Sequence, residues 1–195
     1  TASYLKEYGN YHPTQSWITS NVSPNFPDAA DNWAHLWTAQ SGQHIDGSFG
    51  IDPYGLAGIL GAVGPVTVPG YSGTYDGSNL ATFIEQTEYS QFPGLDSDRR
   101  KNFVSKVAGA VLDKLLSGSG QPQSIATALG QAAGAGHLAL WAAAPAEQRQ
   151  ISGTPLAGEL PRTQAPVASR SVDDASGSKL DYYLDRSLQY ESTSC

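Results

Sequence analysis

The chain has 195 residues, a formal net charge of −7 and a single cysteine, Cys195. Its 11 Lys and Arg residues form no basic run, which argues against a nucleic-acid partner, because binding to a phosphate backbone needs clustered cations. No apolar segment reaches the roughly 18 residues that a membrane-spanning helix needs. The length fits one domain with a sizeable core, and the lone cysteine excludes an internal disulfide.

The N-terminal part predicts an aromatic arm followed by a helix. Residues 1–25 alternate Tyr and Trp with Gly, Asn and Pro, so we expect an irregular segment that packs through its aromatic rings. A helix then begins at Pro27-Asp28 and ends near Gly42. Trp33 and Trp37 share one face of this helix, and we expect both to face the core.

The stretch from Ile45 to Gly70 predicts a strand, a helix and a second strand with short connections. Its first strand ends at Asp52-Pro53, which provides an N-cap acceptor and a proline suited to the first helical turn. Gly64-Pro65 ends the helix, and Val66-Thr67-Val68 begins the second strand. We interpret residues 70–77 as a loop. This unit indicates the α/β class.

The remaining elements follow from periodicity and turn residues. The pattern predicts helices at residues 78–84, 98–116, 122–133 and 145–150, and a short strand at residues 137–141. Alternation over residues 180–191 predicts a half-buried strand that pairs with residues 167–172 in an antiparallel hairpin. We therefore expect a single α/β domain, residues 1–195, with a small mixed sheet flanked by helices and this C-terminal hairpin.

Four separated phrases resemble a family of bacterial, mostly actinobacterial, envelope domains of unknown function, DUF4012. They are Asn21 to Pro27, the stretch from Ile45 to Gly70, His137 to Trp141 with the following Pro145-Ala146-Glu147-Gln148, and Lys179 to Arg186. The resemblance implies an extracytoplasmic place in the cell envelope and no established activity. Because members of the family carry a membrane anchor and a further segment before this region, we expect the chain to be a fragment that lacks both.

A more distant likeness is to the LytR-CpsA-Psr domain. It rests on residues 45–69, on Asp76-Gly77 before a helix, and on the cluster Asp96-Ser97-Asp98-Arg99-Arg100. That family transfers polyprenyl-linked glycopolymers to peptidoglycan, with Mg²⁺ and arginines holding the pyrophosphate. The chain departs from the family pattern, because Gly64-Pro65-Val66 replaces Gly-Gly-Val, the two arginines are adjacent rather than three apart, and the family's N-terminal half has no counterpart.

The same cluster contains the candidate site residues. Arg99 and Arg100 suit a phosphate group because the guanidinium fork pairs with its oxygens, and Asp96 and Asp98 suit a bridging Mg²⁺, the one possible cofactor. A purely structural role is also open, since acids commonly begin helices and Arg99 can pair with Asp96. Asp52 lies at an edge where α/β sheets bind ligands, although its capping role already explains it, and His137 fits a hydrogen-bonded core residue better than a base.

Three functions follow from these features. The first is a non-catalytic extracytoplasmic module that binds a cell-wall glycopolymer or an envelope protein, with exposed aromatics of residues 1–40 and 71–75 stacking on sugar rings. The second is an incomplete phosphotransferase of the LytR-CpsA-Psr kind, acting on a polyprenyl-pyrophosphate-linked glycopolymer. The third is a structural subunit of a larger envelope assembly, with the edge of the C-terminal hairpin as its partner surface.

Overall fold

The computed structural model describes residues 2–87, 97–161, 185, 187–189 and 191. The chain divides into two compact units, Thr1–Glu159 and Leu160–Cys195. The first unit contains helices and small antiparallel sheets, which confirms the mixed α/β class. The predicted hairpin of residues 167–191 lies almost wholly outside the described residues, and the extent of the domain stays a prediction.

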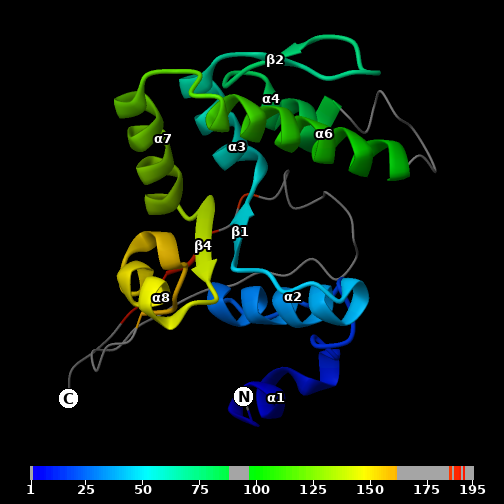
Figure 1. The fold of residues 1–195 in the computed structure, drawn as a ribbon, viewed down its shortest axis with the longest axis vertical. Coiled ribbons are helices and arrows are strands. Elements are labelled where there is room, and N and C mark those ends of the chain that lie inside the picture. Colours follow the sequence, from blue (N-terminus) through cyan, green and yellow to red (C-terminus); the bar gives the residue numbers. More distant parts are fainter. Residues whose placement is uncertain (1, 88–96, 162–184, 186, 190, 192–195) are drawn as a thin grey trace. The chain divides into compact units, whose positions relative to one another are not determined.

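A two-stranded antiparallel ribbon lies at the middle of the first unit. Strand β1 (Gly47–Ile51) pairs with β4 (Leu138–Ala142), and Figure 1 shows the ribbon between helix α2 (Phe26–Ser41) and helix α3 (Pro53–Val63). Because side chains alternate along a strand, one face of the ribbon, the large-residue face, carries Phe49, Ile51, Leu138 and Leu140. The other face, the small-residue face, carries Ser48, Gly50 and Ala139 beside Trp141. A Cβ at Gly50 would come within 2.7 Å of the Phe26 ring, so α2 packs directly on the small-residue face.

Helix α3 is the centre of the hydrophobic core. Its residue Leu60 is fully buried, and the helix packs against α4 (Leu80–Thr82), α6 (Ser97–Leu116) and α7 (Pro122–Gly134). The predicted cap and stop are both confirmed. Asp52 accepts a hydrogen bond from the Gly55 backbone N–H at 2.8 Å, and the helix ends at Gly64.

An aromatic cluster covers one end of this core. Strand β2 (Val66–Thr67) pairs antiparallel with β3 (Thr74–Tyr75), a strand where we predicted a loop. Tyr75 packs with Phe103 of α6 and with Phe83 of the π-helical turn η2 (Phe83–Thr87), and the ring centroids lie 4.9 to 5.0 Å apart. The strand therefore forms because its tyrosine is buried, a cause that local sequence does not reveal.

Residues 2–11 are helical where we predicted an irregular arm, so the prediction is wrong for these residues, whereas residues 12–25 form turns and bends as predicted. Helix α1 (Ala2–Tyr8) continues into the 3₁₀ turn η1 (Gly9–Tyr11). Asn32 of α2 donates hydrogen bonds to the Tyr4 hydroxyl at 2.7 Å and to the Ser20 carbonyl at 3.0 Å, so contacts with α2 fix this segment. The expectation for Trp37 is also wrong, because its side chain is 43% exposed.

Two short elements complete the unit. Helix α8 (Pro145–Ile151) begins at the predicted proline, and the 3₁₀ turn η3 (Pro155–Ala157) follows it. The Gly158 carbonyl accepts a hydrogen bond from the Phe26 backbone N–H at 3.0 Å, which joins η3 to the start of α2. Within the described part of the chain, every helix is too short or too polar to cross a membrane.

Candidate functional site

The predicted arginine cluster falls at the start of α6. Asp98, Arg99 and Arg100 occupy the first turn of this helix, and the Asp98 side chain is exposed, whereas Asp96 lies outside the described residues. Among the described residues, no three His, Cys, Asp or Glu side chains are grouped so that they would hold a metal ion. The roles of Arg99 and Arg100 in phosphate binding, and of Asp96 and Asp98 in Mg²⁺ binding, stay predictions.

The structure brings together two residues that the sequence treated separately, Asp52 and His137. The His137 Nδ1 atom lies 2.7 Å from Asp52 Oδ2, while Asp52 Oδ1 accepts the capping bond at the start of α3. The Asp52 backbone N–H donates to the His137 carbonyl at 3.2 Å, which extends the β1–β4 ladder by one position. The pair therefore joins the β1–α3 turn to the beginning of β4.

The surroundings of this pair favour a structural role. The Tyr54 ring lies 5.4 Å from the His137 ring, and a Cβ at Gly55 would come within 2.5 Å of the His137 carbonyl oxygen. Within the described residues, the His137 side chain is hydrogen-bonded to Asp52 and to no Ser, Thr or Cys side chain. Asp52 and His137 are 85 positions apart, and only the pairing of β1 with β4 reveals their contact.

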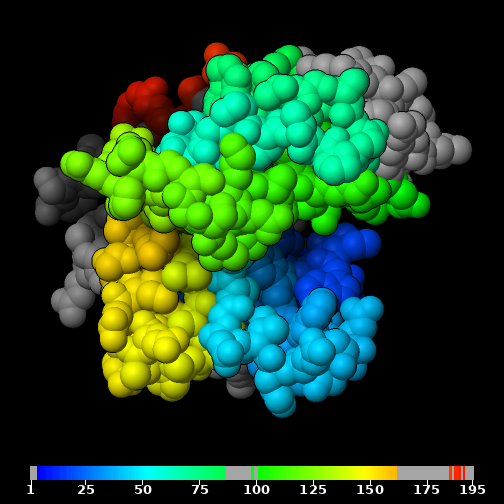
Figure 2. All heavy atoms as spheres, turned by 45° about the horizontal axis from the view of Figure 1, so that its top comes forward, coloured from blue at the N-terminus to red at the C-terminus, as the bar shows by residue number. Residues whose placement is uncertain are grey.

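An apolar groove lies on the large-residue face of the ribbon. Its volume is about 400 Å³, and every described residue that lines it is apolar. Phe49 and Leu140 contribute from the ribbon, and α3, α6, α7 and η3 supply the other walls. Figure 2 shows the green atoms of α6 and α7 above the yellow atoms of α8. Such a surface suits hydrocarbon or apolar side chains rather than sugars.

Two polar hollows flank α2 on the opposite side of the ribbon. The first has a volume of about 470 Å³ and is lined by Tyr4, Leu5, Thr14, Asp28, Asp31, Asn32, His35 and Ala39. The second has a volume of about 500 Å³ and is lined by Asp31, Ala34, His35, Thr38, Ala39, His44, Ile45, Trp141 and Ala143. Asp31, His35 and Ala39 belong to both, and since they are four residues apart they form a ridge along α2.

The ridge carries accessible polar groups. The Asp31 and His35 side chains are 57% and 72% exposed, and His35 Nδ1 lies 2.7 Å from the Asp31 carbonyl oxygen and 3.6 Å from its carboxylate. In the first hollow, burial raises the pKa of the Tyr4 hydroxyl, and the hydrogen bond from Asn32 opposes this shift. We name Asp31, His35, His44 and Trp141 the α2 site, since they are the ionisable and aromatic side chains that line the second hollow.

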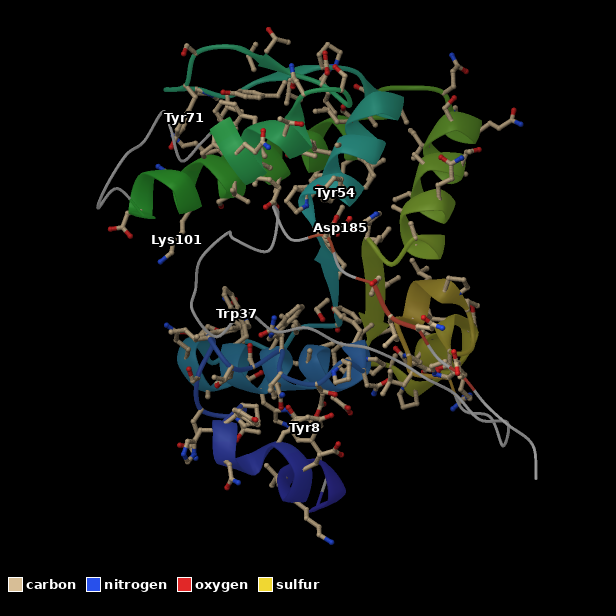
Figure 3. All side chains as sticks on the ribbon, turned by 180° about the vertical axis from the view of Figure 1, so that it is seen from behind. Tyr8, Trp37, Tyr54, Tyr71, Lys101 and Asp185 are labelled. Atoms are coloured by element: carbon tan, nitrogen blue, oxygen red, sulfur yellow. The ribbon has the colours of Figure 1, made fainter. Side chains whose placement is uncertain are left out.

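Exposed tryptophans lie near the C-terminal turns of α2. Trp17 and Trp37 are 46% and 43% exposed, and the Trp17 indole N–H donates to Gln40 Oε1 at 3.1 Å. Figure 3 shows Trp37 projecting from α2 on the side of the ribbon. In the loop where we also expected sugar stacking, Tyr75 is buried and Tyr71 packs on the Phe103 ring at 5.0 Å. Of the two segments where we expected sugar stacking, residues 1–40 therefore hold the exposed rings, those of Tyr11, Trp17 and Trp37.

Comparison with known proteins finds a family match for part of the chain. The chain has no significant match among curated proteins or solved structures. Residues 1–89 match the family model described as a protein of unknown function (DUF4012). The matched region includes Asp31, His35, His44 and Asp52, and it ends before the arginine cluster and before His137. The first 89 residues are thus similar to a domain of unknown function.

Proposed function

We propose that this chain is an extracytoplasmic cell-envelope module that binds a cell-wall glycopolymer without catalysis. The observation that carries the proposal is the α2 site, where exposed polar side chains and an aromatic ring meet beside two neighbouring hollows. The resemblance to the bacterial envelope family supports the extracytoplasmic location in this proposal. Among the described residues, the His137 side chain pairs with Asp52 and with no Ser, Thr or Cys side chain, so binding is the simpler function.

The side chains of the α2 site match the chemistry of a sugar chain. The Asp31 carboxylate accepts hydrogen bonds from hydroxyl groups, and the His35 and His44 rings each donate or accept them. The Trp141 ring offers an apolar face to the C–H groups of a sugar ring. By contrast, the described residues that line the groove on the other face of the ribbon include no polar side chain that could pair with sugar hydroxyls.

Retention on protein-free bacterial sacculi tests this proposal. The purified chain should sediment with sacculi that retain their glycopolymers and should stay in solution with sacculi stripped of them. Asp31→Ala and His44→Ala should reduce retention, whereas Asp113→Ala, an exposed acid on α6 away from both hollows, serves as the matched control. Equal retention of all four proteins, or none by either kind of sacculus, contradicts the proposal. Because the sacculi hold no protein, a chain that binds an envelope protein instead is retained by neither kind of sacculus.

A second candidate is an incomplete LytR-CpsA-Psr-like phosphotransferase acting on a polyprenyl-pyrophosphate-linked glycopolymer. The apolar groove favours it, because a polyprenyl chain is pure hydrocarbon, and α6 contributes both to the groove and to the arginine cluster. A polyprenyl pyrophosphate with Mg²⁺ at a hundred times its Kd should stabilise the chain by about 2.7 kcal/mol. Loss of this shift in Arg100→Ala supports the candidate, and no shift in the wild-type chain refutes it.

A further inference from the structure

We infer that the glycan held at the α2 site is uncharged, a sugar chain without phosphate or carboxylate groups. This inference rests on the proposed function and deepens it. It follows from three features of the hollows: the sign of their charges, the direction of their hydrogen bonds, and the fixed position of their aromatic ring.

The charges beside α2 are unfavourable for an anionic polymer. The hollows contain two carboxylates, Asp28 and Asp31, and no Lys or Arg lines either of them among the described residues. In the first hollow, Asp28 Oδ2 accepts a hydrogen bond from the Ser23 hydroxyl at 2.9 Å. The whole chain carries a formal charge of −7, so long-range electrostatics also repel a polyanion.

The hydrogen-bonding groups point to a ligand rich in donors. An ionised carboxylate only accepts hydrogen bonds, and a phosphodiester oxygen only accepts them too, so Asp31 and a phosphate offer each other no donor. A sugar hydroxyl or acetamido N–H supplies that donor. His35 lies on the same ridge, where its side chain is 72% exposed and its Nδ1 atom is 2.7 Å from the Asp31 carbonyl oxygen.

The backbone that carries the Trp141 ring belongs to the β1–β4 ladder and not to a loop. Trp141 lies opposite Ser48 in the β1–β4 pairing, and just beyond it the Ala143 backbone N–H donates to the Asp46 carbonyl at 2.8 Å. Because the backbone at Trp141 is already ordered by the ladder, a ligand that packs on this side chain does not have to order a loop. Its face prefers the C–H surface of a neutral pyranose to an anionic group, because the π face is itself negative.

Isothermal titration of the full chain tests the inference. The neutral probes are tetrasaccharides of glucose, mannose, galactose and N-acetylglucosamine, and the anionic probe is poly(glycerol phosphate), all at about 150 mM salt, where long-range repulsion is largely screened. We expect at least one neutral tetrasaccharide to bind and the anionic polymer not to bind. Asp31→Ala should weaken the neutral binding by at least about tenfold, as expected for a hydrogen bond to a charged group, while Asp113→Ala leaves it unchanged.

The outcomes separate the inference from the proposed function. Binding of poly(glycerol phosphate) as tight as that of every neutral probe overturns the inference, and glycopolymer binding itself then stands. If the chain binds neither kind of probe and is not retained on sacculi, both fail. Binding of a neutral probe that is unaffected by Asp31→Ala, and also by His44→Ala, places the ligand elsewhere and overturns the inference. Thermal unfolding of each variant confirms that it is folded.

Discussion

Replacing Asp52 tests whether its pair with His137 joins the two halves of the ribbon. Asp52→Ala removes the cap of α3, which is worth about 1 kcal/mol, and the hydrogen bond at 2.7 Å to His137, worth about another 1 kcal/mol. The expected loss of unfolding free energy is therefore about 2 kcal/mol, or a fall in Tm of roughly 4 to 8 °C for a chain of this size. Asp52→Asn keeps a good capping residue and should lose only about half as much.

A double-mutant cycle isolates the contact between the two side chains. His137→Ala should cost about 1 kcal/mol, and the variant that lacks both side chains should unfold only as easily as Asp52→Ala, since the shared bond is lost once. Urea denaturation followed by circular dichroism measures all four proteins, with equal m-values showing that the comparison is valid. A coupling energy within about 0.3 kcal/mol of zero would refute the reasoning, because the two residues would then act independently.

Three further predictions concern the core and its charges. Phe103→Ala should cost about 3 to 5 kcal/mol in denaturant titration, because this fully buried ring contacts three other aromatic rings; a loss below about 1 kcal/mol would contradict the packing. Gly120→Ala should cost more than about 1 kcal/mol, since φ is +91° and a Cβ would overlap the Ala62 carbonyl oxygen; unchanged stability would contradict that geometry. Burial, with a smaller contribution from Tyr71, raises the pKa of Tyr75 above 10.0, so its contribution to stability should persist below pH 10.0 and be lost as pH rises through the folded-state pKa. Melting at alkaline pH should show this loss in the wild-type chain and less of it in a Tyr75→Phe variant, and equal losses would contradict it.

Capping residues, prolines, glycines and apolar periodicity predicted the helices whose ends depend on neighbouring residues in the sequence. The helix from Pro53 to Val63 begins at a capping acid with proline behind it and ends at a glycine, so sequence alone located both ends. The long helix α6 was equally clear, because its apolar residues recur for more than four turns.

Elements that depend on distant partners were missed. Helix α1 is held by the bond between Tyr4 and Asn32, which are 28 positions apart, and its seven residues are too few to form a stable helix alone. Strand β3 exists because Tyr75 packs into the aromatic cluster. The large exposure of Trp37 has the same origin, since only the position of the ribbon decides which part of α2 is covered.

The candidate site residues show the same difference between features that local sequence determines and features that distant contacts determine. The position of Arg99 and Arg100 in the first turn of a helix was predicted correctly, but their role depends on groups brought near by the fold. The α2 site combines Asp31 and His35 with Trp141, about a hundred positions away, and no short motif connects them. The weak sequence signal was the number of aromatics near α2, which suggested sugar binding without locating the site.

The central claim is that this chain binds a glycan beside α2, and an amide chemical-shift titration tests it most directly. The full chain would be titrated with isolated cell-wall glycopolymer fragments, including any neutral tetrasaccharide that binds. Our account predicts that the shifts concentrate in residues 28–45 and 141–143, which line the two hollows. Shifts confined to the apolar groove, at residues 49–51 and 108–115, or no shifts at all, would contradict it.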